Sequence, residues 1–310
     1  MVFQNGYVIY PDKFREPHYR ISPFSNADVS YLKERYLKMQ FPGNEYLINK
    51  FGKYYVFTED GRSAINRVLS MYNLSIADNI WIVTTTGNYY VSSCVTKEIE
   101  KYCSWSREKT PQTKLIFVIH EFGAVYKDME NLKRHGLPII EDLAMSMFST
   151  DDIGKVGQYG DFAIYSLPKF FPIQFGGVVQ CNNSSYWDAM NEDFGENYVD
   201  FLSSITEEYL YKQSSVCEKR KINYQYLRER FEALGNDVSI SLSDLEVPSV
   251  FMFNDMNTDL DRLKVFMQQH GVECSVFYGR KAFFIPVHQN LQLSDLDYMV
   301  ELYKHFRNEF

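Results

Sequence analysis

Short apolar runs and amphipathic segments alternate along the first half of the chain. The apolar runs lie at residues 79–84, 114–120 and 137–142, and their length suits strands that are buried on both faces. Residues 89–102 and 127–135 have the spacing of apolar positions that is typical of helices. Strands that alternate with helices in this way predict an α/β domain with a mostly parallel central sheet.

The pattern differs in the last third of the chain. A long helical pattern extends from about residue 206 to residue 234, and Gly235 suits the left-handed conformation that ends a helix. Two strand-like segments follow, at residues 247–253 and 272–277. A helical segment lies between them at 258–270, and another begins at Ser294. Ser294 with Asp297 three residues later resembles a capping box in which Asp replaces Glu.

These two patterns indicate two domains, for which a chain of 310 residues is long enough. We expect a large α/β domain over residues 1–205 and a smaller α+β domain over residues 206–310. No internal repeat or low-complexity linker separates them, so the domains are expected to share the long helix and to pack closely.

Two of the predicted strands end in ionisable side chains. His120 closes the run at 114–120, and Asp142 closes the run at 137–142. In open α/β sheets, ligands bind in the crevice outside the carboxyl ends of the strands, so both side chains are expected beside a ligand. A histidine at a strand end more often satisfies a loop carbonyl than it reacts, and we leave His120 out of the catalytic set.

A pyridoxal phosphate (PLP) site needs a carboxylate and an amine. Asp142 offers the carboxylate, and Lys169, which lies downstream of it, offers the amine. An unprotonated amine can hold the cofactor aldehyde as an imine, and a carboxylate can keep the cofactor's ring nitrogen protonated. The amine is unprotonated only where its cation is disfavoured, in a dry pocket or beside another positive group. We therefore predict Lys169 and Asp142 as catalytic residues.

A seat for the cofactor's phosphate is predicted at the start of a helix over residues 62–72. Gly61 permits a tight turn before this helix, and the backbone N–H groups of Arg62 and Ser63 would lie at its N-terminus. Unpaired donors and the helix dipole favour an anion there, and Arg62 adds a positive charge. A glycine before a helix is by itself usually only a turn, so the prediction depends on the ordered set of residues.

Several segments, taken in order, resemble the DegT/DnrJ/StrS family of sugar aminotransferases. They are Gly-Arg-Ser-Ala-Ile at 61–65, His-Glu-Phe-Gly at 120–123, Ile-Glu-Asp-Leu-Ala at 140–144, Gly-Lys-Val-Gly-Gln-Tyr-Gly-Asp at 154–161, Tyr-Ser-Leu-Pro-Lys at 165–169 and Gly-Gly at 176–177. Residues 271–278 and 285–298 also resemble this family's small-domain strand and closing helix. The resemblance covers most of the chain and implies the fold type I of PLP-dependent transferases.

The resemblance also implies roles for individual residues. Lys169 would form the imine and later carry the proton, and Asp142 would pair with the pyridine nitrogen. Arg62, Ser63 and Ser166 would bind the phosphate. The aromatic side chain that stacks on the cofactor ring would be Tyr89 or, second, Tyr90. Asn197 would reach the phosphate of a partner subunit across a homodimer interface.

The sequence also departs from the family pattern. Met145 stands where the family usually has a Gln that contacts the ring hydroxyl of the cofactor. The segment at 195–199 lacks the family's Arg, and the chain is shorter than is usual for the family.

The function that this resemblance implies is amino transfer. The chain is predicted to move an amino group, by resemblance from glutamate, to a keto sugar carried by a nucleotide, for amino-sugar and surface-polysaccharide biosynthesis. Two alternatives stay open: a PLP-dependent sugar dehydratase or eliminase on the same fold, and a non-catalytic homologue that only binds.

The composition agrees with a globular enzyme that acts on small molecules. The net charge of −8 and the lack of a Lys/Arg cluster argue against a nucleic-acid partner. The 5 cysteines are scattered and form no Cys-x-x-Cys pair, so neither a disulfide framework nor a metal site is expected. No targeting segment and no run of about 20 apolar residues is visible, which predicts a cytoplasmic protein without membrane contact.

Overall fold

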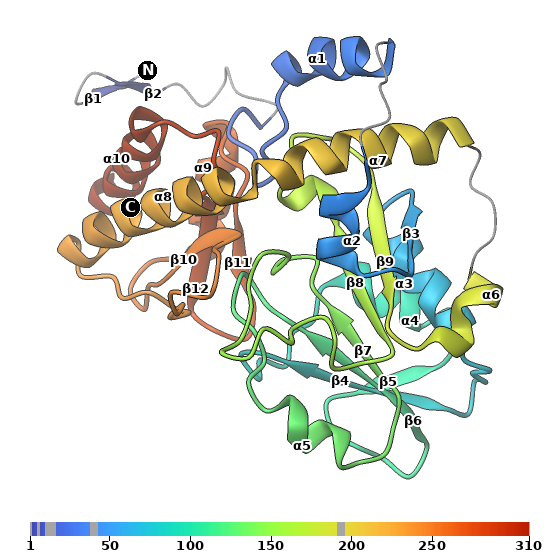
Figure 1. The fold of residues 1–310 in the computed structure, drawn as a ribbon. Coiled ribbons are helices and arrows are strands. Elements are labelled where there is room, and N and C mark those ends of the chain that lie inside the picture. The colour runs from blue at the N-terminus through green and yellow to red at the C-terminus, as the bar shows by residue number, and fades with distance from the viewer. Residues whose placement is uncertain (1, 5–6, 10–16, 38–42, 191–195, 310) are drawn as a thin grey trace.

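A sheet of seven strands lies at the centre of the larger part of the molecule (Figure 1). The computed structural model describes residues 2–4, 7–9, 17–37, 43–190 and 196–309. The strand order is β3-β9-β8-β7-β6-β4-β5. The strands are β3 (Tyr55–Thr58), β4 (Asn79–Thr84), β5 (Ser104–Ser106), β6 (Thr113–Ile119), β7 (Ile139–Asp142), β8 (Phe162–Ser166) and β9 (Gly177–Cys181). Only β9 runs antiparallel to its neighbours, which confirms the predicted mostly parallel sheet.

Helices cover both faces of this sheet, which explains why its central strands are mostly apolar. On one face, α3 (Gly61–Ser70) and α4 (Ser93–Ile99) pack against β4, β6, β7 and β8. On the other face lie α2 (Glu45–Phe51), α5 (Met129–Lys133) and α7 (Glu196–Tyr211). Helices α4 and α5 are shorter than the predicted segments 89–102 and 127–135, because loops occupy the ends of both segments.

The smaller part of the molecule has its own sheet of three antiparallel strands, in the order β10-β12-β11. The strands β10 (Val250–Asn254), β11 (Ser275–Phe277) and β12 (Ala282–Pro286) pack against α8 (Gln213–Ala233), α9 (Leu260–Gln269) and α10 (Leu293–Glu309). The predicted helix at 206–234 is in fact divided between α7 and α8. Strand β12 was not predicted, although it is the central strand of this sheet.

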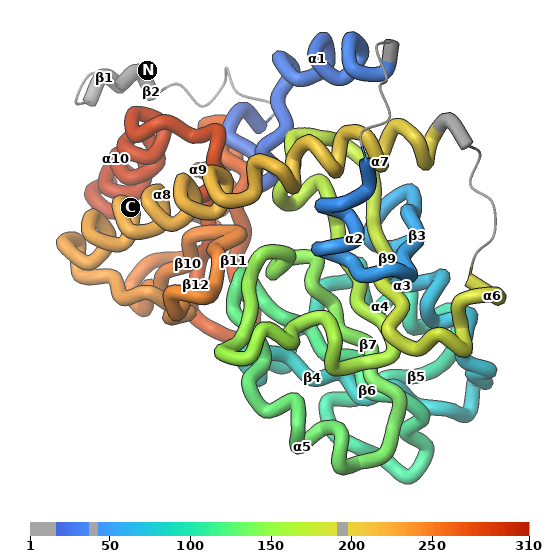
Figure 2. The backbone as a smooth tube through the Cα atoms, in the orientation of Figure 1, coloured from blue at the N-terminus to red at the C-terminus, as the bar shows by residue number. Residues whose placement is uncertain are grey.

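Helix α8 links the two parts (Figure 2), and its packing changes along its length. Val216, in its first turn, packs with the core beneath the large sheet. Leu227 and Phe231, in its second half, pack in the core of the small sheet. The predicted domain boundary at residue 205 falls within α7, whereas the change from one core to the other occurs within α8.

The capping box predicted at Ser294 and Asp297 is wrong by two positions. Helix α10 begins at Leu293, and the carboxylate of Asp295 accepts a hydrogen bond from the backbone N–H of Gln292 at 2.8 Å. Asp297 instead accepts hydrogen bonds from Tyr226 and Arg230 of α8. The acidic side chain therefore caps this helix in the predicted way, but from another residue.

The remaining described elements contribute little to the cores, apart from Met190, which is fully buried beside α3 and α4. They are the hairpin β1 (Val2–Gln4) and β2 (Tyr7–Ile9), helix α1 (Asn26–Leu37) and the short α6 (Trp187–Met190). Across the described ranges, none of the helices is both long and apolar enough to cross a bilayer. The same ranges contain no group of three or more side chains arranged to hold a metal ion.

Candidate active site

A cavity of about 620 Å³ lies at the carboxyl ends of four parallel strands. The last residues of β4, β6, β7 and β8 all line it: Thr84, Ile119, Asp142 and Ser166. The same cavity is lined by Gly61, Arg62, Tyr90 and Lys169. The parallel register therefore brings together residues that are separated by more than a hundred positions in the chain.

Asp142 presents a buried carboxylate to this cavity. One of its oxygens accepts a hydrogen bond from the backbone N–H of Ala144 at 2.9 Å. Burial raises the pKa of the Asp142 carboxyl from 3.8 to about 6, and the neighbouring His120 offsets part of this rise. Within the described ranges, no lysine or arginine forms an ion pair with Asp142. A cationic ring nitrogen in the cavity would supply the charge that this carboxylate lacks.

His120 lies in the same cavity wall and is fully buried. Its Nδ1 accepts a hydrogen bond from the backbone N–H of Tyr126 at 3.0 Å, so the proton of the neutral ring is on Nε2. That Nε2 lies 3.3 Å from a carboxylate oxygen of Glu141. The ring thus accepts from a loop N–H instead of donating to the expected loop carbonyl, and its Nε2, although near Glu141, has no hydrogen bond to a described residue.

Lys169 ends a single 3-10 turn, Leu167–Lys169, that directly follows β8. Pro168 stands within the first two positions of this turn, where its fixed backbone angle is suitable and its missing N–H is not needed. The side chain is half-buried and lines the cavity. Its amine has no ion pair or hydrogen bond with any other described residue, so the amine is available to a ligand.

The predicted phosphate seat lies at the start of α3, where Asp60 caps the helix. The carboxylate of Asp60 accepts hydrogen bonds from the backbone N–H of Ser63 at 2.7 Å and from its hydroxyl at 2.9 Å. Both donors that were expected from Ser63 are therefore engaged. The backbone N–H groups of Gly61 and Arg62 are the ones left to face an anion.

Two further contacts shape this seat. Gly61 lies so close to Ser166 that a Cβ at position 61 would be 3.3 Å from the Ser166 Cβ. The absence of that Cβ brings the helix terminus beside the Ser166 hydroxyl. The Arg62 guanidinium is exposed and lies 3.3 Å from the Cys94 sulfur. Gly61, Arg62 and Ser166 thus surround one end of the cavity.

The two tyrosines that were candidates for stacking differ in position. Tyr90 lines the cavity, and its ring lies 5.6 Å from that of Tyr278. Tyr89, the favoured candidate, is 74% exposed and lies near Trp105 outside the cavity. Asn197 is in the first turn of α7, and its side chain lies outside the described part of the chain.

One wall of the cavity is apolar and was not predicted. Phe122 packs against Phe277 and Phe284, with ring centroids 5.2 and 5.3 Å apart. Met145 packs in the same cluster, so an apolar side chain stands where the family usually has the polar Gln. Phe122 has φ of 55°, a conformation that costs free energy for a bulky residue and that no sequence pattern indicated.

Glu121 is a second cavity residue that the sequence analysis missed. Its carboxylate is buried and accepts a hydrogen bond from the backbone N–H of Thr86 at 2.7 Å. Burial raises the pKa of the Glu121 carboxyl. Its place directly after His120 at a strand end was the available signal.

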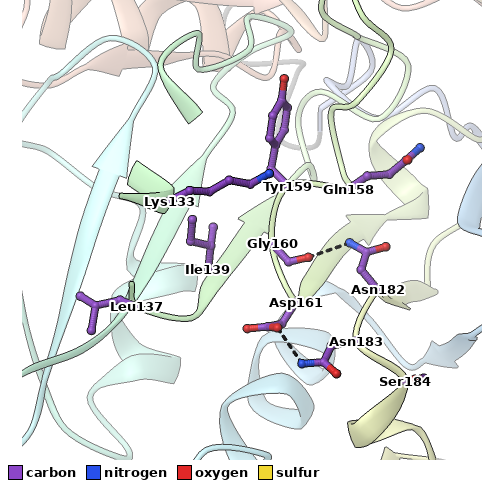
Figure 3. A pocket seen from close by; sticks show the side chains of 10 residues that line it. All are labelled: Lys133, Leu137, Ile139, Gln158, Tyr159, Gly160, Asp161, Asn182, Asn183 and Ser184. Carbon is purple, nitrogen blue, oxygen red and sulfur yellow. Dashed lines mark hydrogen bonds between the residues drawn. The ribbon is translucent and has the colours of Figure 1, made fainter. Parts of the chain in front are cut away.

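A second hollow, of about 470 Å³, lies at the opposite edge of the sheet, where β7 and β8 begin (Figure 3). Two of its polar side chains, those of Asn182 and Asn183, are paired with other residues of the hollow. The Asn183 amide donates to Asp161 at 3.0 Å, and the Asn182 amide donates to the Gly160 carbonyl at 2.9 Å. Because these groups already have partners and lie far from Lys169 and Asp142 in the sheet, the first cavity is the candidate active site.

Comparison with known proteins agrees with the resemblance found in the sequence. The model of the DegT/DnrJ/EryC1/StrS aminotransferase family matches residues 106–192. The L-glutamine:2-deoxy-scyllo-inosose aminotransferase of Streptoalloteichus tenebrarius is 40% identical over 62 residues. That match covers 19% of this chain and only 14% of the relative's length.

Solved structures match the fold over nearly the whole chain. The aminotransferase TlmJ from Streptoalloteichus hindustanus has a TM-score of 0.76 at 13% identity, covering 95% of this chain and 99% of that one. Spr1654 from Streptococcus pneumoniae in its PMP form has a TM-score of 0.73 at 15% identity, covering 98% of both chains. GDP-4-keto-6-deoxy-D-mannose-3-dehydratase from Escherichia coli, with bound hydrated PLP, has a TM-score of 0.69 at 15% identity, covering 93% and 99%.

The predicted fold class is therefore confirmed, and so is the resemblance on which it was based. Residues 106–192 match the model of the DegT/DnrJ/EryC1/StrS aminotransferase family, and nearly the whole chain has the fold type I of PLP-dependent transferases.

Proposed function

We propose that this protein is a PLP-dependent aminotransferase that transfers an amino group, from a donor such as glutamate, to a keto sugar carried by a nucleotide. The observation that carries the proposal is the joint position of Lys169 and Asp142 in the wall of one cavity, with a helix N-terminus at the same cavity. These three features suit the aldehyde, the ring nitrogen and the phosphate of one small molecule.

The residues present fit this cofactor. Asp142 is a buried carboxylate without a cationic partner among the described residues, and a protonated ring nitrogen would supply one. The N–H groups of Gly61 and Arg62 and the Ser166 hydroxyl would hold the phosphate. Tyr90, which lines the same cavity, would cover one face of the ring.

When bound, PLP supplies an electron sink for the bond that breaks at the substrate carbon. Asp142 would hold the proton on the ring nitrogen, which keeps that sink effective. Lys169 would bind the aldehyde carbon through Nζ and, once released by the substrate amine, would move a proton to or from the substrate carbon through the same atom. The apolar wall of Phe122, Phe277 and Phe284 would exclude water from these groups.

The finer parts of the proposal concern assembly and setting. We propose a homodimer in the cytoplasm, acting in amino-sugar and surface-polysaccharide biosynthesis, in which Asn197 reaches the phosphate of the partner subunit. Exposed large side chains on α1, α2 and α7 support a subunit interface there: Tyr36, Tyr46, Ile48 and Tyr211. Asn197 belongs to α7, one of these helices.

The central test replaces Lys169. We expect Lys169→Ala to bind PLP non-covalently, to lose the visible absorbance of a lysine-linked cofactor, and to lose turnover while it stays folded. Release of 2-oxoglutarate from glutamate is the activity measurement. Lys155→Ala is the matched control, because Lys155 is exposed and lies outside the cavity. Retained amino transfer in Lys169→Ala would contradict the proposal.

A sugar dehydratase is the second candidate, and Met145 is the observation that favours it. The polar contact usual in the aminotransferases is replaced by an apolar cluster, and one solved structure of this fold is a 3-dehydratase. The nitrogen content of the sugar product, after incubation with glutamate and a keto sugar, separates the two reactions from each other. An aminotransferase converts a stoichiometric amount of glutamate to 2-oxoglutarate with each keto sugar aminated, whereas a dehydratase leaves a product that has lost water and gained no nitrogen.

A further inference from the structure

Arg220, on α8, is fully buried and contacts the turn that carries Lys169. Its guanidinium donates hydrogen bonds to the Lys169 carbonyl at 2.9 Å, to the Pro248 carbonyl at 3.1 Å and to the Gln289 side chain at 2.8 Å. It also lies over the ring of Phe170, at 4.4 Å from the centroid. One side chain thus joins the Lys169 turn to two segments of the smaller part of the molecule.

Gln289 completes this arrangement from the other side. Its carbonyl oxygen accepts the hydrogen bond from Arg220, and its amide nitrogen donates to the Phe170 carbonyl at 2.8 Å. The backbone carbonyls of Lys169 and Phe170 are therefore both held, one by Arg220 and the other by Gln289. These bonds fix the backbone at the position from which the Lys169 side chain extends into the cavity.

The acceptors around Arg220 are all neutral, which makes its burial costly. Among the described residues no carboxylate forms an ion pair with Arg220, and burial lowers the pKa of its guanidinium to about 9. A buried charge without an opposite charge is usually unfavourable for stability, and an apolar side chain would serve packing better. The planar fork of donors offers what an apolar side chain lacks, namely fixed directions to three oxygen atoms at once.

We propose that Arg220 and Gln289 are a positioning pair, which holds the Lys169 turn so that the amine meets the cofactor aldehyde. The inference rests on the proposed function, because it assigns to both residues a role that acts through Lys169. Neither residue lines the cavity, so neither is a catalytic residue.

The same helix offers a matched control. Asn223 is also fully buried on α8, and its amide donates to the carbonyls of Val287 and His288, which directly precede Gln289. It therefore joins the same helix to the same loop, but it does not contact the Lys169 turn. Replacing Asn223 disturbs the packing between α8 and this loop without removing a bond to Lys169 or Phe170.

The experiment compares the unmodified protein with Gln289→Ala, Arg220→Lys and Asn223→Leu at a temperature at which each is folded. Each is mixed with PLP, the growth of visible absorbance is followed, and borohydride trapping with peptide mass spectrometry measures the fraction attached at Lys169. The dissociation constant of inorganic phosphate and the melting temperature are measured in parallel.

If the inference holds, attachment at Lys169 slows by about tenfold or more in Gln289→Ala and Arg220→Lys, because small misplacements of a reacting group are costly. Asn223→Leu is expected to be less stable but to attach PLP within about twofold of the unmodified rate. The hydrogen bonds that it loses go to Val287 and His288 and not to the Lys169 turn. Phosphate affinity should not change in any variant, because the seat at α3 is not held by these residues.

Unchanged attachment in Gln289→Ala would overturn the inference, even if Arg220→Lys did not fold. An equal slowing in Asn223→Leu would overturn it as well, because the effect would then follow packing in general. If the unmodified protein itself does not attach PLP at Lys169, the proposed function fails and the positioning role fails with it. That result differs from the others, in which the unmodified protein attaches the cofactor.

Discussion

At the scale of single residues, Asp142 carries an uncompensated charge in a buried place. Burial raises the pKa of its carboxyl from 3.8 to about 6, and among the described residues the Ala144 N–H is the one donor that it has. A carboxylate in this state destabilises the folded protein at neutral pH, and a cationic ligand removes the penalty. Burial of this charge thus destabilises the folded protein without a ligand and, for the same reason, favours the binding of a protonated ring nitrogen.

This predicts the pH dependence of an Asp142→Asn variant without cofactor. Because the folded pKa lies above the unfolded one, the stability linked to protonation is present below pH 3.8 and is lost as the pH rises through about 6. Asn keeps the hydrogen bond to Ala144 and carries no charge. We expect it to be more stable than the unmodified protein above that pH, by up to about 3 kcal/mol.

Urea unfolding between pH 4 and pH 8 measures this difference. The gain should shrink toward pH 4, and added PLP should stabilise the unmodified protein more than the variant. A gain that is largest at pH 4 would mean that folding lowers the pKa of Asp142 and does not raise it.

At the scale of elements, the start of α3 combines a helix cap with an anion site. Asp60 satisfies the N–H and the hydroxyl of Ser63, which stabilises the helix end. Its negative charge lies at the terminus that is proposed to receive the phosphate. The capping residue therefore opposes the ligand, while the helix dipole and Arg62 favour it.

This predicts that Asp60→Ser binds phosphate more tightly. Serine caps helices about as well as aspartate but is uncharged, so the helix is kept and the repulsion is removed. We expect inorganic phosphate to bind about two- to fivefold more tightly at low salt, with a smaller difference at high salt, because these groups are exposed.

Titration of phosphate at two salt concentrations checks the prediction. Asp259→Ser is the control, since Asp259 is the exposed cap of α9 and accepts a hydrogen bond from the Arg262 N–H. Weaker phosphate binding in Asp60→Ser would mean that Asp60 supports the seat instead of opposing it.

At the scale of the whole molecule, the two parts also meet beside the cavity mouth. The Asn88 amide donates to the Tyr278 carbonyl at 2.6 Å, and Arg280 donates to the Thr86 carbonyl at 2.6 Å. Gly279 lies between these contacts with φ of 90°, and a Cβ there would be 2.2 Å from the Asn88 side-chain oxygen. The close approach of the two segments thus depends on a glycine.

We therefore expect Gly279→Ala to separate the segments at 86–91 and 278–281. The substitution introduces both a strained backbone conformation and a collision with Asn88. Gly154→Ala introduces similar strain, at φ of 68°, in open space. Gly279→Ala should lower the free energy of unfolding more than Gly154→Ala, by about 1 kcal/mol or more.

Hydrogen exchange measured by mass spectrometry locates the effect. Only Gly279→Ala should raise exchange in both segments. Equal exchange in the two variants would mean that the contacts between these segments do not hold the two parts together.

How far the sequence predicted this protein can be seen in particular elements. The apolar runs predicted β4, β6 and β7 to within two residues, because a strand that is buried on both faces appears in the sequence as a short apolar run. Helix boundaries were less accurate, because α4 and α5 end where loops make tertiary contacts, and α8 was joined to α7. Strand β12 was missed, because its place in the sheet is decided by β10 and β11 on either side.

By itself, the sequence determined the alternation of strands and helices and, through the strand-end rule, that Asp142 would lie at the edge of the sheet where the cavity is found. The motif that includes Lys169 indicated the second group. The tertiary structure alone decided that Tyr90 lines the cavity and Tyr89 does not, that Phe277 and Phe284 form a wall with Phe122, and that Arg220 holds the Lys169 turn. The physical reason is that these contacts join segments far apart in the chain, whose relative placement comes from the packing of the two cores and from no local pattern.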